Sequence, residues 1–142
     1  MSKRLVKIRF ALLAGVALTL AAGLFLLGGA LDGACGNTLV QSEESPDGRL
    51  KAVLFERSCG ATTGVSSQVS IIGTTDGLGN EAGNVFIAEA GDGSGGSAFW
   101  GGPMVELRWR RATLLEVRHD SMAEVFQAVQ SLGAVRVLYL PE

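Results

Sequence analysis

The chain has 142 residues, of which 47% are hydrophobic and 18% charged, and its formal net charge at pH 7 is −2. Four of the 12 basic residues precede position 10, and all 14 acidic residues follow position 31. The chain after residue 9 therefore has a formal net charge of 8 − 14 = −6. An acidic domain repels phosphate backbones, which argues against a nucleic acid partner. The abundance of Val, Ile and Leu excludes a disordered composition, and the length suits one small domain.

Residues 1–9 form a basic N-terminus, and residues 10–31 follow without a single charge. A helix of this length spans about 33 Å, which matches the hydrocarbon core of a bilayer. We therefore predict a transmembrane anchor over 10–31 whose partner is the lipid bilayer of the cytoplasmic membrane. The positive end stays inside, so the N-terminus is predicted to be cytoplasmic and the following domain to lie outside.

Two alternatives to a retained anchor stay open at this stage. The basic start, with the small residues 28–30, also fits a signal peptide that is cleaved after Ala30. Lipidation at Cys35 is disfavoured, because Asp32 occupies the position where an apolar residue is required. We predict a linker over 32–44 and an extracytoplasmic β domain over 45–142.

The two cysteines, Cys35 and Cys59, predict one disulfide, because an even number of cysteines in an exported domain is usually paired. The enclosed loop would contribute about 3–4 kcal/mol in the chain-entropy model. Two free thiols, or a nucleophilic Cys59, are the alternatives. A cysteine nucleophile needs a nearby base, and the only histidine, His119, lies far away in the sequence.

The β domain is predicted to begin with a hairpin. Pro and Gly favour a turn at Ser45, Pro46, Asp47 and Gly48. An apolar strand follows over 50–56, and two glycines then interrupt it at the corner formed by Gly60, Ala61, Thr62, Thr63 and Gly64. Apolar and polar residues alternate over 65–72, which is typical of a second strand antiparallel to the first.

The order of this turn, this corner and the later Trp109 resembles a group of uncharacterised bacterial envelope proteins classed as domains of unknown function. The resemblance covers residues 43–119. It implies a membrane segment followed by a small β domain, and it implies no catalytic residue.

Two glycine-rich loops frame a predicted central strand over 85–88. In the first loop, over 73–83, Asp76, Asn80 and Glu81 carry oxygen atoms, but their spacing matches no calcium loop, so we predict a solvated turn. The second loop, over 91–102, lacks the lysine of a phosphate-binding loop. Its Phe99 and Trp100 are interpreted either as a plug over the sheet edge or as an exposed interaction loop.

The C-terminal part alternates again over 105–110 and 115–118, with Glu106, Arg108, Glu116 and Arg118 predicted on outer faces where exposed pairs contribute little. His119 is predicted to be a solvated residue at a strand end. A capping-box pattern at Ser121 and Glu124 predicts a short helix that stops at Gly133. A last strand is predicted over 135–140. The fold class is therefore mainly β, with five or six antiparallel strands and one short helix near the C-terminus.

Three functions remain open. The favoured one is a non-catalytic binding or structural module of the envelope that contacts another protein. A small-ligand or cation site in the glycine loops is the second. The third is a hydrolase using Ser or Thr near Gly60–Gly64, which is disfavoured because no catalytic triad is apparent. No metal or cofactor site is predicted.

Overall fold

The computed structural model describes residues 12–20, 22–23, 35–60, 63–91 and 98–142. The chain divides into two compact units, residues 1–34 and residues 35–142, which are described separately. In the first unit, residues 12–20 and 22–23 are helical. Among the described residues, no helix is both long and apolar enough to cross a membrane. The rest of the predicted anchor over 10–31, including the cleavage site at residues 28–30, lies outside the described residues.

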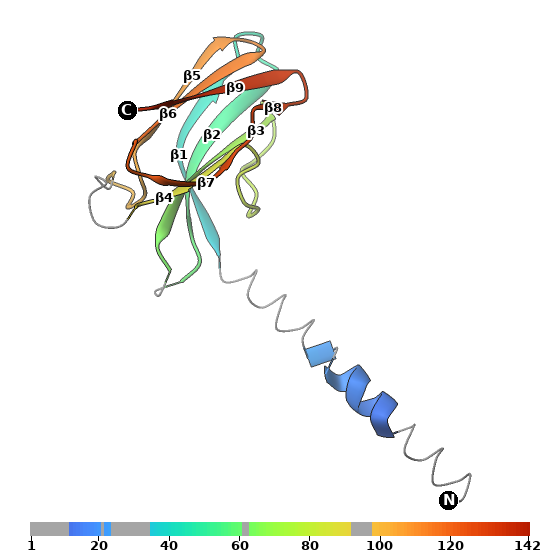
Figure 1. The fold of residues 1–142 in the computed structure, drawn as a ribbon. Helices are drawn as coiled ribbons and strands as arrows, with labels where there is room; N and C mark the ends of the chain where they lie inside the picture. The colour runs from blue at the N-terminus through green and yellow to red at the C-terminus, as the bar shows by residue number, and fades with distance from the viewer. Residues whose placement is uncertain (1–11, 21, 24–34, 61–62, 92–97) are drawn as a thin grey trace, which may run out of the picture. The chain divides into compact units, whose positions relative to one another are not determined.

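The second unit is built from two β-sheets that pack face to face (Figure 1). One sheet has the strand order β1-β2-β3-β4-β7, and the other has the order β5-β6-β9-β8. Strands β6 and β9 are parallel, and every other pair is antiparallel. The strands of the described chain are β1 (Gly36–Glu44), β2 (Leu50–Ser58), β3 (Val65–Gly73), β4 (Phe86–Glu89), β5 (Val105–Arg111), β6 (Leu114–His119), β7 (Glu124–Ala128), β8 (Ser131–Leu132) and β9 (Val135–Pro141).

The mainly β class and the predicted hairpin are confirmed. Strands β2 and β3 pair in register from Leu50 opposite Gly73 to Ser58 opposite Val65. Every second residue of these strands therefore points toward the facing sheet. Leu54 of β2 and Val69 of β3 lie opposite each other and are fully buried.

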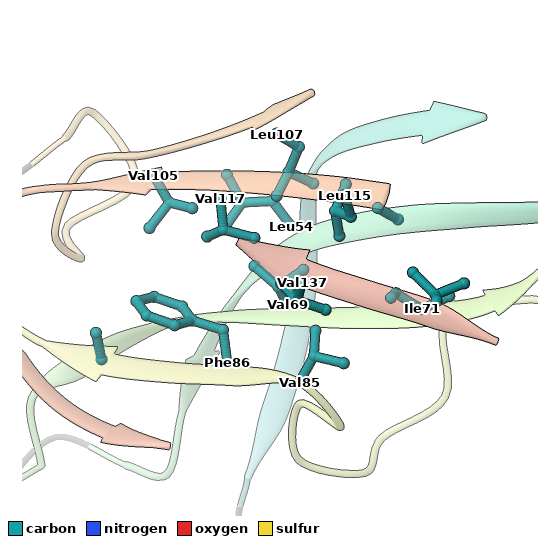
Figure 2. Packing of buried hydrophobic residues seen from close by; sticks show 13 residues of the cluster. Leu54, Val69, Ile71, Val85, Phe86, Val105, Leu107, Leu115, Val117 and Val137 are labelled. Atoms are coloured by element: carbon teal, nitrogen blue, oxygen red, sulfur yellow. The ribbon is translucent and has the colours of Figure 1, made fainter. Parts of the chain in front are cut away.

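The core lies between the two sheets, and Figure 2 shows side chains from both sheets converging there. Phe86 contributes a fully buried aromatic ring to this core, stacked on Tyr139 at a centroid distance of 5.6 Å. The Tyr139 hydroxyl lies 2.8 Å from the Val85 carbonyl oxygen and 2.7 Å from that of Val129. Burial raises the pKa of Tyr139 to about 12. This residue of β9 thereby ties the second sheet to the connection between β7 and β8, which crosses from one sheet to the other.

The predicted helix after Ser121 is wrong, because residues 124–128 form β7, and β8 follows. The Asp120 carboxylate accepts a hydrogen bond from the Met122 amide at 2.8 Å, which makes a turn instead of a helix cap. Val125 and Phe126 favour a strand. Pairing with β7 also supplies hydrogen-bond partners to the backbone groups at the edge of β4. This pairing cannot be predicted from the local sequence.

The strand count and the linker also need correction. The described chain has nine strands instead of five or six, and β1 occupies most of the range 32–44 that was predicted as a linker. Strand β1 was missed because it is an edge strand with few apolar residues. It is held by its pairing with β2 and by the Trp109 indole, which donates a hydrogen bond to the Glu43 carbonyl oxygen at 2.8 Å.

The outer face of the second sheet carries a buried carboxylate. Glu116 is only 3% exposed, although it was predicted to be an outward charge. A bulge in β5 lies at Arg110, whose Nε donates to Glu116 Oε2 at 2.7 Å. Arg118 Nε donates to Glu116 Oε1 at 2.8 Å. The hydrogen bond from Arg110 contributes most, followed by that from Arg118, and together they hold the pKa of Glu116 below its ordinary value of 4.5.

We expect the substitution Glu116→Gln to lower the melting temperature by a few degrees at pH 7, because the amide cannot pair with two guanidinium groups. A folded-state pKa below the unfolded value contributes stability above the unfolded pKa, and that stability disappears as the pH falls through the folded pKa. Thermal unfolding from pH 7 to pH 3 should therefore show the difference between the two proteins shrinking below about pH 4.5. The control is Glu106→Gln, which removes an exposed carboxylate from β5. An equal effect of both substitutions would contradict this account.

Candidate functional site

A cleft opens at one end of the two packed sheets, beside the turn formed by Ser45, Pro46, Asp47 and Gly48, which we call the SPDG turn. It has a volume of about 440 Å³ and receives residues from both sheets. We call it the turn cleft, and its lining residues are Asp47, Arg49, Leu50, Ile71, Ile72, Gly73, Ala112, Thr113, Leu132, Gly133, Ala134 and Val135. Its size lies in the range of small-molecule sites.

The SPDG turn forms one rim of the turn cleft, and its own side chains shape it. Ser45 Oγ donates to Asp47 Oδ1 at 2.7 Å, and Arg49 Nε donates to Asp47 Oδ2 at 2.8 Å. The hydrogen bond from Ser45 contributes most, followed by that from Arg49, and together they lower the pKa of Asp47 to about 2. Gly48 has φ of 68°, a conformation that favours glycine. The motif residues Ser45, Asp47 and Gly48 are therefore explained by the turn itself.

The other end of the hairpin carries the disulfide. Cys35 and Cys59 are bonded, which confirms the predicted pairing and removes the thiol needed for a nucleophilic Cys59. Gly60 has φ of 124°, and its carbonyl oxygen accepts hydrogen bonds from the amide and the hydroxyl of Thr63. Ala61 and Thr62, the other members of the predicted corner, lie outside the described residues.

Opening the disulfide should destabilise the second unit by about 3–4 kcal/mol, because the bond closes a loop of 25 residues in the unfolded chain. Chemical denaturation of the full chain, with and without reductant, measures this change. The double substitution Cys35→Ser/Cys59→Ser should match the reduced protein and show no response to reductant. Equal unfolding midpoints for the oxidised and reduced protein would contradict the expectation.

The predicted interaction loop contains one half-buried and one exposed aromatic residue. Trp100 packs against the core, and its Nε1 donates to the Ser67 hydroxyl at 2.9 Å. Phe99 is 93% exposed and lies edge-on to Trp100, with ring centroids 4.9 Å apart. The tight turn between Ala98 and Gly102 holds both rings, with hydrogen bonds from the Ala98 amide to the Gly102 carbonyl at 2.9 Å and from the Gly101 amide to the Ala98 carbonyl at 2.8 Å. Trp100 thus takes the packed position of a plug, whereas the exposure of Phe99 leaves its role in an interaction a prediction.

Most of the first glycine-rich loop is exposed, as predicted, and hydrogen bonds hold it in place. The Asn80 amide donates to the Cys35 carbonyl oxygen at 2.9 Å, and Asp76 Oδ2 accepts from the Gly73 amide at 3.1 Å. Asp76 and the side-chain amide of Asn80 therefore stabilise the fold of this loop. In the described part of the chain, no three His, Cys, Asp or Glu side chains are grouped as metal ligands.

His119 lies half-buried at the end of β6, so it is less solvated than predicted. Its ring packs against Phe86 at a centroid distance of 5.3 Å, and its Nδ1 lies 3.0 Å from the Asp120 carbonyl oxygen. A depression of about 170 Å³ beside it is lined also by Glu106, Arg118 and Glu142. Arg118 is bound to Glu116 and Glu142. The contacts of His119 are those of a packing residue.

Sequence reasoning missed the turn cleft because three reversals that are far apart in the chain form it. These are the SPDG turn, the reversal at Ala112–Thr113 and the reversal at Gly133–Ala134. One signal was present in the sequence: Arg49 and Arg111 each lie directly beside one of these reversals, and Arg136 lies two residues after Ala134.

Comparisons with protein-family models, with curated proteins and with solved structures found no significant match. The fold and the geometry of these sites therefore carry the functional argument.

Proposed function

We propose that this protein is a membrane-tethered, extracytoplasmic binding module that contacts a second protein of the envelope through Phe99. The observation that carries the proposal is the 93% exposure of Phe99 on an ordered turn. A large apolar ring in this state gains free energy when a partner covers it, by about 2–3 kcal/mol for full burial. Aromatic residues of this kind dominate the energetics of protein interfaces.

The turn around Phe99 favours binding because it is already ordered in the free protein. Trp100 is fixed by its hydrogen bond to Ser67, and Ser67 in turn donates to the Pro103 carbonyl oxygen at 2.7 Å. A side chain at Gly102 would meet the Ser67 hydroxyl at 2.5 Å, so the close approach requires glycine there. Little conformational entropy is therefore lost when a partner binds this surface.

The proposed location rests on the sequence and on the disulfide. The basic residues before position 10, followed by the uncharged run over 10–31, favour an anchor with the domain outside. The Cys35–Cys59 bond favours an oxidising compartment. No contact in the described residues favours the hydrolase alternative, and the cysteine nucleophile is excluded by the disulfide.

Replacing Phe99 with the photoreactive analogue benzoylphenylalanine should give one discrete protein adduct upon irradiation of intact cells of the source organism. The matched control is the same replacement at Phe126, which is 58% exposed on β7. The adducts are separated by electrophoresis and identified by mass spectrometry. Adducts that contain only lipid, or the same protein adducts from both positions, would contradict the proposal.

The substitution Phe99→Ser should then weaken binding to the identified partner at least tenfold, whereas Phe126→Ser should leave it unchanged. This expectation follows from the apolar area that Phe99 would bury. Thermal unfolding of both variants should remain close to that of the parent, because exposed side chains contribute little to stability.

A further inference from the structure

Three arginines surround the turn cleft. Arg49 lines the cleft itself. Arg111 and Arg136 line an adjoining depression that shares Thr113 and Ala134 with the cleft. Within the described residues, the side chains of Arg111 and Arg136 form no ion pair, and Arg49 pairs only with Asp47. This end of the molecule therefore offers guanidinium groups that the fold does not use.

The carboxylate that lines the turn cleft is already bound within the protein. Asp47 accepts hydrogen bonds from Ser45 and Arg49. The linings of the turn cleft and of the adjoining depression together hold three arginines and one carboxylate, Asp47, whereas the chain after residue 9 is strongly acidic. An anion is therefore attracted to this end of the domain and repelled by most of the remaining surface.

The floor of the turn cleft is apolar. Leu50 and Ile71 pack at the margin of the core, and Leu132 at the rim is 36% exposed. An alkyl group on this floor would leave water, and each methylene buried in this way strengthens binding roughly fourfold. A ligand that matches the site has an apolar tail and an anionic head.

We propose that the turn cleft binds a small anionic amphiphile, with its alkyl tail on the apolar floor and its phosphate or carboxylate head at the arginines. Guanidinium groups suit this head because their planar donors match two oxygen atoms at once. The proposal does not depend on the Phe99 contact. Trp100 is bound to Ser67 near the start of β3, whereas the turn cleft contains Gly73 at its end.

Photoaffinity labelling of the full chain in phosphatidylcholine nanodiscs tests this site. One probe is an alkyl phosphate with a diazirine in its tail, and the other is an alkylammonium with the same tail. Peptide mapping by mass spectrometry should place the phosphate probe on residues 50–73 and 131–136, with at least five times the yield of the ammonium probe. Equal labelling by both probes, or labelling elsewhere, would overturn the proposal.

Arg136→Gln and Arg49→Gln should each reduce this labelling at least threefold. The matched control is Arg108→Gln, because Arg108, like Arg136, is an exposed strand arginine between two better-buried residues, but it lines neither the turn cleft nor the adjoining depression. Unlabelled alkyl phosphate should displace the probe, whereas inorganic phosphate should do so only at much higher concentration. Equal displacement by both would show that the apolar floor is not used, and an equal loss in all three variants would show that no local arginine binds the head.

Discussion

The burial of both faces of β3 is the constraint on which the rest of the second unit depends. All residues from Ser66 to Ile71 are buried, although those on the outer face, Ser66, Gln68 and Ser70, are polar. A buried polar group without a partner is costly, so each of these side chains must find one. Among the described residues, no buried side-chain polar atom lacks a hydrogen bond.

The partners of Gln68 and Ser70 come from the loop that follows β3. The Gly83 amide donates to Gln68 Oε1 at 2.7 Å, and the Asn84 amide donates to the Ser70 hydroxyl at 3.1 Å. The Asn84 side chain bonds both the amide and the carbonyl of Ile71, each at 2.9 Å, and so takes the place of a neighbouring strand where β4 has not yet begun. The loop over 74–84 is therefore held against the sheet by its backbone, which explains how glycine-rich sequence can form a fixed structure.

Local patterns in the sequence predicted β2 and β3 because alternation and turn residues point to the same answer there. They failed where the decisive interaction is distant in the chain. The residues after Ser121 have apolar side chains at helical spacing, but their pairing with β4 makes them a strand. The outer face of β3 alternates correctly, yet the sequence contains no sign that a loop covers it. Glu116 was assigned to the surface because its alternation places it on the outer face. The sequence does not show that a bulge in β5 places Arg110 beside its carboxylate.

The two candidate sites lie at opposite ends of β3, and this arrangement bears on how they would work together. Ser67 anchors the Phe99 turn, and Gly73 lies in the turn cleft. The strand between them is buried from Ser66 to Ile71 and pairs with β2 along its whole length. On its other side it is bonded by β4 up to Val69 and by Asn84 at Ile71, so its packing favours a single arrangement. Coupling between distant sites requires an element with two states that both ligands bias. A partner at Phe99 and an amphiphile in the turn cleft would therefore bind independently, which is the behaviour of a scaffold that holds two molecules and does not switch between them.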